Sequence, residues 1–263
     1  MRSRSCGEGP YPLALTSSRI VLSIGVPAAD LDGAYSGHNE FTDSIRRGRF
    51  KIVSRRWLAD RSRDTIPQQM KITLDSNCLI ALERDEQATL PLRSLVELHI
   101  SGRLQLCISA ISASERKRSG VDAWPPFQVF LDRLAEARLS SVGLLRPIGY
   151  WGIVYVDQCW SNIEQHHLDL EQEIHHVLFP KLEFSYEAYC TRIGIPHEPS
   201  VRDHRWLNAK CDVQALWCHI YSGNDVFVTS DKNFHKATKH MRLIELGAKE
   251  ILTPEALLRQ IPV

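Results

Sequence analysis

Several carboxylates in this sequence follow predicted strands or begin a predicted helix. In an α/β sheet, residues at these positions can contact a ligand. Asp212 falls in the first turn of a stretch whose apolar residues recur at helical spacing, and Asp231 follows the strand-like run 225–229. Asp75 directly follows another such run, 71–74. In an open α/β sheet, ligands bind outside the carboxyl ends of the strands. Because Mg²⁺ takes oxygen ligands, this placement indicates a divalent-cation site.

Strands and helices alternate along residues 70–263, as the positioning of these carboxylates requires. Strands are predicted over 71–74, 104–109, 225–229 and 249–252, and helices from residue 79, over 91–102, 111–118, 212–222 and 234–246, and from Pro254 behind an N-cap Thr253. Strands joined through helices run parallel, because the crossover is right-handed. The pattern therefore predicts one α/β domain whose strand ends share an edge.

The segment 119–205 shows no clear strand pattern. Amphipathic spacing predicts helices over 127–139, 162–178 and 185–192. We therefore expect a mostly helical insertion or cap within the domain.

Residues 1–69 differ from the rest of the chain. They are rich in Ser, Arg and Gly, carry more basic than acidic residues, and show no sustained periodicity. Such a segment is typical of a poorly structured, flexible extension, or of an over-long start, since Met70 directly precedes the first strand. A basic arm that binds RNA is the alternative.

Composition sets the class of protein. Hydrophobic residues make up 43% and charged residues 24%, as in ordinary globular proteins. The formal net charge is +1, so any nucleic-acid site must be local.

Seven cysteines without a C-x-x-C pair predict reduced thiols in a cytoplasmic protein. No run approaches the ~18 apolar residues of a membrane helix, so no membrane partner is expected.

The order of the polar residues after these strands is specific. The strand KITL is followed by Asp75, Asn77 and Leu-Ile; Ser109 is followed six residues later by Glu115; then come Asp212, the turn Thr229-Ser230-Asp231, and Asn233-Phe234. This order resembles that of the PIN-domain nucleases, over roughly residues 70–258. The resemblance implies a Rossmann-like three-layer fold and a Mg²⁺- or Mn²⁺-dependent nuclease that usually acts on RNA.

The resemblance also implies roles for individual residues. Asp75, Glu115, Asp212 and Asp231 would be the catalytic, metal-binding acids, with Asn77 and Thr229 as supporting polar groups; Asn233 stands where many members carry another acid. A metal held there would stabilise developing charge and lower the pKa of an attacking water, as phosphodiester hydrolysis requires. An antitoxin-like or other protein partner, or a homo-oligomer, is compatible with this assignment.

Basic residues flank two of these acids. Arg116 and Lys117 follow Glu115, and Lys232 and Lys236 follow Asp231. Such residues could contact substrate phosphates, although a solvated helix face explains them as well.

Other assignments are weaker. The pairs His166-His167 and His175-His176 are adjacent in sequence, so the members of each pair point to different sides of a helix, and packing is favoured over a zinc site. No G-x-S-x-G or G-x-G-x-x-G motif occurs. A haloacid-type phosphatase would need an acid where Asn77 stands. The remaining alternative is a non-catalytic PIN-like module that binds RNA or a protein, which the repulsion among crowded carboxylates disfavours.

Overall fold

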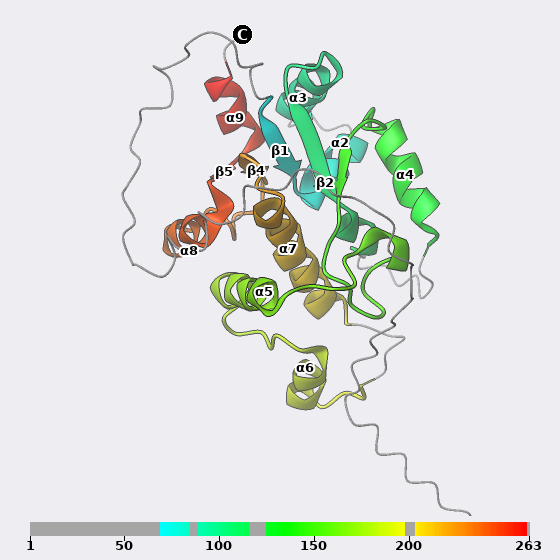
Figure 1. Cartoon of the computed structure of the whole chain (residues 1–263), viewed down its shortest axis with the longest axis vertical. Coiled ribbons are helices and arrows are strands. Elements are labelled where there is room, and N and C mark those ends of the chain that lie inside the picture. The colour runs from blue at the N-terminus through cyan, green and yellow to red at the C-terminus, as the bar shows by residue number, and fades with distance from the viewer. Residues whose placement is uncertain (1–68, 85–88, 116–124, 198–202, 262–263) are drawn as a thin grey trace, which may run out of the picture. The chain divides into compact units, whose positions relative to one another are not determined.

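The computed structural model describes residues 69–84, 89–115, 125–197 and 203–261. Within them, parallel strands form one five-stranded sheet in the order β3-β2-β1-β4-β5 (Figure 1). The strands are β1 Lys71–Leu74, β2 Gln105–Ser109, β3 Gly143–Leu145, β4 Val226–Val228 and β5 Glu250–Leu252. The predicted parallel α/β sheet is confirmed. The predicted N-terminal extension lies, apart from Gln69, outside the described residues.

The strand order reverses at β1. Strands β2 and β3 follow on one side of β1 and strands β4 and β5 on the other, so that Thr73 of β1 is opposite both Cys107 and Phe227. In a doubly wound sheet, ligands bind at such a reversal, outside the carboxyl ends of the strands. Asp75 immediately follows β1 and therefore lies at this point.

One face of the sheet is covered by helices from both ends of the described chain. They are α2 Ser76–Arg84, α3 Leu90–Ile100, α4 Phe127–Glu136 and α9 Pro254–Gln260. Alternate residues of a strand point to opposite faces, and Ile72, Leu74 and Val228 point into this core. Burial of each such side chain contributes about 1.5–3 kcal/mol, so this face is held by apolar packing.

The other face carries a second core, into which Phe227 and Ile251 project from the sheet. Its helices are α5 Gln165–Leu178, α6 Tyr186–Ile193, α7 His204–Tyr221 and α8 Ala237–Leu243; short turns are the 3₁₀ segments η2 Ala110–Ser114 and η3 Val156–Gln158, and the π-helical turn η4 Ile244–Ala248. No helix in the described part of the chain is long and apolar enough to cross a membrane. The sheet and its two helical layers make a three-layer α/β fold.

The start of α7 differs from the prediction. The helix begins at His204, because the carboxylate of Asp203 caps it and accepts a hydrogen bond from the backbone N–H of Arg205 at 2.9 Å. Asp212 therefore lies in the middle of the helix, and its predicted place in the first turn is wrong. The apolar spacing that predicts the helix is clearest after Asp212, whereas the N-cap residue lies well before it, at Asp203.

The edge strand β3 was not predicted. Its three residues, Gly143 to Leu145, are half-buried and too few to show an alternating pattern. The strand forms because it pairs with β2, where Gly143 is opposite Cys107. A Cβ atom at residue 143 would lie 3.0 Å from Cys107 Sγ, so glycine permits this close approach. The segment 119–205 thus contributes a strand to the sheet as well as the expected helices.

The N-cap of α9, which directly follows β5, can be tested by substitution of Thr253. Thr253 Oγ1 accepts a hydrogen bond from the backbone N–H of Ala256 at 3.2 Å, and Pro254 follows as the first helical residue, as predicted. Thr253→Ala should lower the free energy of unfolding by about 1 kcal/mol, while Thr253→Ser should retain most of it. Urea unfolding measures both. An equal loss in the two variants would show that the hydroxyl does not act as the cap.

Candidate active site

Asp75 is held by donors from the start of α2 and from the residue that follows β4. Its side chain is buried, with a relative exposure of 2%. Oδ1 accepts from the backbone N–H of Ser76 at 2.8 Å, and Oδ2 accepts from Asn77 Nδ2 and Thr229 Oγ1, both at 2.7 Å. The Asp75 backbone N–H donates to Val228 O at 2.9 Å and extends the pairing of β1 with β4. Both strands therefore fix the position of this carboxylate.

The hydroxyl of Thr229 connects Asp75 to the turn after β4. It donates to Asp75, and it accepts from Asn77 Nδ2 at 2.9 Å and from the backbone N–H of Asp231 at 3.0 Å. One donor and two acceptor positions are the full capacity of a hydroxyl. Asn77 and Thr229, which the sequence predicts as supporting residues, thus join two of the four predicted acids, Asp75 and Asp231, in one network.

Asp231 is fixed by the geometry of its own turn. Its Oδ1 accepts from the backbone N–H of Asn233 at 2.8 Å, and its backbone carbonyl accepts from the N–H of Phe234 at 3.2 Å. Phe234 is completely buried and packs against Phe227, with ring centroids 5.3 Å apart. An aromatic anchor in the second core therefore holds the Asp231 turn in place.

Glu115 and Asp212 approach from the neighbouring elements. Glu115 ends the 3₁₀ segment η2, which continues directly from β2, and Asp212 lies at the centre of α7. Both side chains are half-buried. The Glu115 atom Oε2 is buried and has no hydrogen-bond partner among the described residues. Such an oxygen is available to a ligand.

The electrostatics show that the acids share one environment. The pKa of Asp75 is raised to about 7, mainly by burial and also by the charges of Glu115 and Asp231, while the hydrogen bonds from Thr229 and Ser76 oppose the rise. Burial, and then the charges of Asp75, Glu115 and Asp231, also raise the pKa of Asp212 well above its usual range. Burial raises the pKa of Glu115, which a hydrogen bond from Ser76 opposes. The four carboxylates thus repel one another.

A divalent cation would remove this repulsion, and an all-oxygen donor set suits Mg²⁺ or Mn²⁺. In the described residues, no three Asp, Glu, His or Cys side chains lie close enough together to enclose one ion. The acids are therefore electrostatic neighbours around a common point, without a closed coordination shell. Binding of an ion would require these side chains to come closer together.

Asn233 occupies a different role from that of a ligand. Its Nδ2 donates to Leu178 O at 3.2 Å, and its Oδ1 accepts from Lys239 Nζ at 2.6 Å and Lys236 Nζ at 3.3 Å. Lys239 Nζ also donates to Leu178 O, at the C-terminal end of α5, where a cation is stabilising. Asn233 and Lys239 thus join the Asp231 turn to α5. The sequence interpretation missed this role of Lys239.

The predicted phosphate-binding residues are described in part. Lys232 and Lys236 are exposed in the turn beside Asp231. Arg116 and Lys117 lie outside the described residues. At this edge, the exposed lysines therefore place positive charge next to the acids.

Three serines near the acids were missed by the sequence interpretation. The backbone N–H of Ser76 donates to Asp75, and the side chain of Ser76 opposes the rise in the pKa of Glu115. The hydroxyls of Ser112 and Ser114 are buried and have no hydrogen-bond partner in the described part of the chain. The only local signal for them is the serine-rich run that precedes Glu115.

The histidine pairs make packing contacts. His167 lies edge-on to Trp217 and Tyr221, with ring centroids 6.1 and 4.7 Å apart. His175 Nε2 lies 2.8 Å from Leu182 O, between α5 and the loop that follows it. These contacts agree with the preference for packing over zinc binding.

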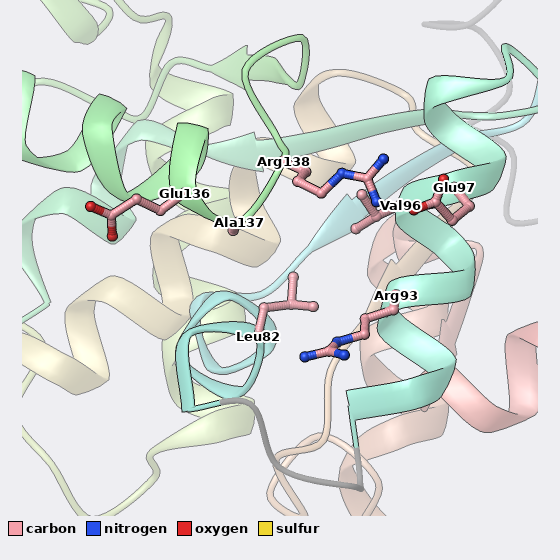
Figure 2. A pocket seen from close by; sticks show the side chains of 7 residues that line it. All are labelled: Leu82, Arg93, Val96, Glu97, Glu136, Ala137 and Arg138. Atoms are coloured by element: carbon pink, nitrogen blue, oxygen red, sulfur yellow. Dashed lines mark hydrogen bonds and ion pairs between the residues drawn. The ribbon is translucent and has the colours of Figure 1, made fainter.

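A separate hollow of about 230 Å³ lies between α2, α3 and the end of α4 (Figure 2). Its lining comprises Leu82, Arg93, Val96, Glu97, Glu136, Ala137 and Arg138. Arg138 forms an exposed ion pair with Glu97, and Figure 2 shows Arg93 extending from α3 toward Leu82. Two guanidinium groups and two carboxylates balance each other there, so the lining favours neither charge of ligand. None of the four acids contributes to it.

The sequence matches no protein-family model and no curated protein. The function of this chain is therefore inferred from the geometry and chemistry of the acids at the β1–β4 reversal.

The raised pKa of Asp75 predicts how the metal-free protein responds to pH. An unfolded aspartate titrates at about 4, so between about 4 and 7 the folded state binds the proton more readily. The free energy of unfolding in chelator should therefore fall as pH rises through this range, by more than about 1 kcal/mol. Asp75→Asn should reduce the slope.

Urea unfolding across this range tests the expectation, with Asp225→Asn as the matched control. Asp225 precedes β4 at the opposite edge of the sheet, where it pairs with Lys249. If Asp75→Asn leaves the pH dependence as it is in the unmodified protein, Asp75 does not carry the proton.

Proposed function

We propose that this chain is a metal-dependent endoribonuclease of the PIN-like class. The observation that supports the proposal best is the buried Asp75 carboxylate at the strand reversal, in the field of Glu115, Asp212 and Asp231. Carboxylates with raised pKa values in one site, held by donors from several elements, are characteristic of functional sites. RNA is proposed as the substrate on the resemblance in the order of the acids.

The residues of this chain would act by holding and orienting. Asp75, Glu115, Asp212 and Asp231 would bind Mg²⁺ or Mn²⁺, which supplies charge stabilisation and a water of lowered pKa. Thr229 and Asn77 hold the Asp75 carboxylate by two bonds of 2.7 Å, so its orientation does not depend on the ligand. The burial of Asp75 excludes water and strengthens its interaction with a cation.

Lys232 and Lys236 would contact the phosphates of the substrate. Both lysines are exposed and follow Asp231 in the same turn. Phosphate contacts position a nucleic acid without reading its sequence, so these residues would contribute affinity and no preference for particular bases. We also propose a cytoplasmic location, because the six cysteines of the described residues are all free.

The second candidate is a module that binds RNA or a protein, such as an antitoxin-like partner, without cutting. The raised pKa values of Asp75 and Asp212 argue against it, since a binding surface gains nothing from buried carboxylates that repel one another. A cleavage assay separates the two candidates directly.

The full-length protein should cut mixed single-stranded RNA in Mg²⁺ or Mn²⁺, and excess chelator should abolish the cut. Asp75→Asn and Asp212→Asn should each lower kcat by at least about 100-fold, the scale of losing one electrostatic stabiliser. Asp225→Asn, the same chemical change at the opposite edge of the sheet, should leave kcat unchanged. Binding of RNA without cleavage in any divalent ion would favour the second candidate, and equal cleavage in chelator would exclude the metal mechanism.

Neutralising both exposed lysines should weaken the salt dependence of RNA binding. Each phosphate contact on a single strand contributes about 0.7 to the slope of log affinity against log salt. Lys232→Gln with Lys236→Gln should therefore lower that slope by up to about 1.4. Arg84→Gln with Arg259→Gln removes two exposed charges from the ends of α2 and α9 and serves as the control. Equal slopes in the two double variants would assign the lysines to a solvated surface.

A further inference from the structure

A buried polar network lies beneath α7, on the side of the helix away from Asp212. Lys210 and Glu171 form an ion pair, with Nζ and Oε1 2.5 Å apart and side-chain exposures of 3% and 0%. Gln214 Nε2 donates to the same carboxylate, and its Oε1 accepts from the backbone N–H of Ile148 at 2.9 Å. Tyr150 OH donates to the other Glu171 oxygen. The network therefore joins α7 to α5 and to the loop after β3.

Every polar group of this network has a partner. Among the described residues, none of its side-chain atoms is left buried and unpaired. Lys210 Nζ also lies 4.1 Å from the ring centroids of both Tyr150 and Phe184, as in a cation–π contact. A fully satisfied buried network rigidifies its surroundings and specifies a single arrangement.

Apolar packing alone would leave the rotation of α7 poorly determined. Nearly all residues from Trp206 to His219 are buried, and α5 packs against the helix (Figure 1). Hydrophobic contacts are non-directional, and apolar cores lose uniqueness before they lose stability. The hydrogen bonds of Lys210 and Gln214, in contrast, are directional and lie one helical turn apart.

The rotation of α7 decides where Asp212 points. Asp212 is two residues from both Lys210 and Gln214, and two residues are separated by about 200° around a helix. The network therefore contacts the side of α7 opposite Asp212. We propose that Lys210, Gln214 and Glu171 are positioning residues that hold Asp212 toward Asp75, Glu115 and Asp231; this inference rests on the proposed function.

The test replaces the network without leaving a buried charge. Lys210, Glu171 and Gln214 are all changed to methionine, which is unbranched and of similar volume. The triple variant should be less stable, because the Tyr150 hydroxyl and the Ile148 N–H lose their acceptors. It should still unfold cooperatively, because exchanging a whole buried ion pair for apolar residues is often neutral. The Mn²⁺ concentration that half-saturates its thermal stabilisation should rise at least about tenfold, and kcat on RNA should fall at least about tenfold. KM should change little, since Lys232 and Lys236 are untouched.

Leu207→Ala is the matched control for a loss of stability. Leu207 is completely buried in the same helix and contributes only apolar packing. This variant should melt at a lower temperature and retain the Mn²⁺ midpoint of the unmodified protein. A positioning role therefore differs from a merely structural one in the metal response.

Gln214→Met alone keeps the ion pair and tests the positioning role if the triple variant does not fold. It should shift the Mn²⁺ midpoint in the same direction. A midpoint and a kcat equal to those of the unmodified protein, in either folded variant, would overturn the positioning role. If the unmodified protein shows neither a Mn²⁺ response nor cleavage, the proposed function fails, and this inference fails with it.

Discussion

The burial of one carboxylate at the end of the central strand is the constraint on which this structure depends. Removing Asp75 from water is costly unless its oxygens are hydrogen-bonded, and they are bonded by Ser76, Asn77 and Thr229. Thr229 follows β4, so the donors are complete only when β1 and β4 are neighbours in the observed register. Three features thus act together to supply hydrogen bonds to Asp75 and to position it. They are the reversal of strand order, the hydrogen bond from Asp75 N–H to Val228 O, and the polar turn after β4.

Helix α7, in the second core, is also fixed by buried polar contacts. A helix that is buried nearly all round needs directional contacts to settle in one orientation, and α7 has them toward both ends. His219 lies 3.0 Å from both Thr73 Oγ1 and Ala248 O, while Lys210 is paired with Glu171. Asp212 lies between these two anchors. The polar groups in this core therefore connect α7 to the sheet, to η4 and to α5.

The repulsion among the acids lowers the stability of the folded protein at the site that we propose to be functional. Asp75 and Asp212 have raised pKa values because burial and neighbouring negative charge both disfavour ionisation. Without a cation, the folded state carries this strain, and the two apolar cores offset it. Functional sites often break local rules of stability in this way, with compensation elsewhere in the fold.

Much of the site could be read from short segments of sequence. The strand residues 71–74 are followed by Asp75, and the strand before Thr229 is followed by Asp231, so strand and terminator lie within a few positions. Thr253 and Pro254 likewise signalled α9. Signals of this kind are local because backbone preference and hydrogen bonding to the next turn involve residues close in the chain.

The rest depended on contacts between distant segments. The strand β3 is too short for a pattern of its own and exists through its pairing with β2. The direction of Asp212 depends on the rotation of α7, which Glu171 restrains from a position 39 residues before Lys210. Asn233 lies beside Asp231, to which its backbone N–H donates, but its side chain is bound to Lys239 and to the end of α5. Burial, pairing and mutual charge repulsion arise only when such segments meet, so no local pattern could have specified them.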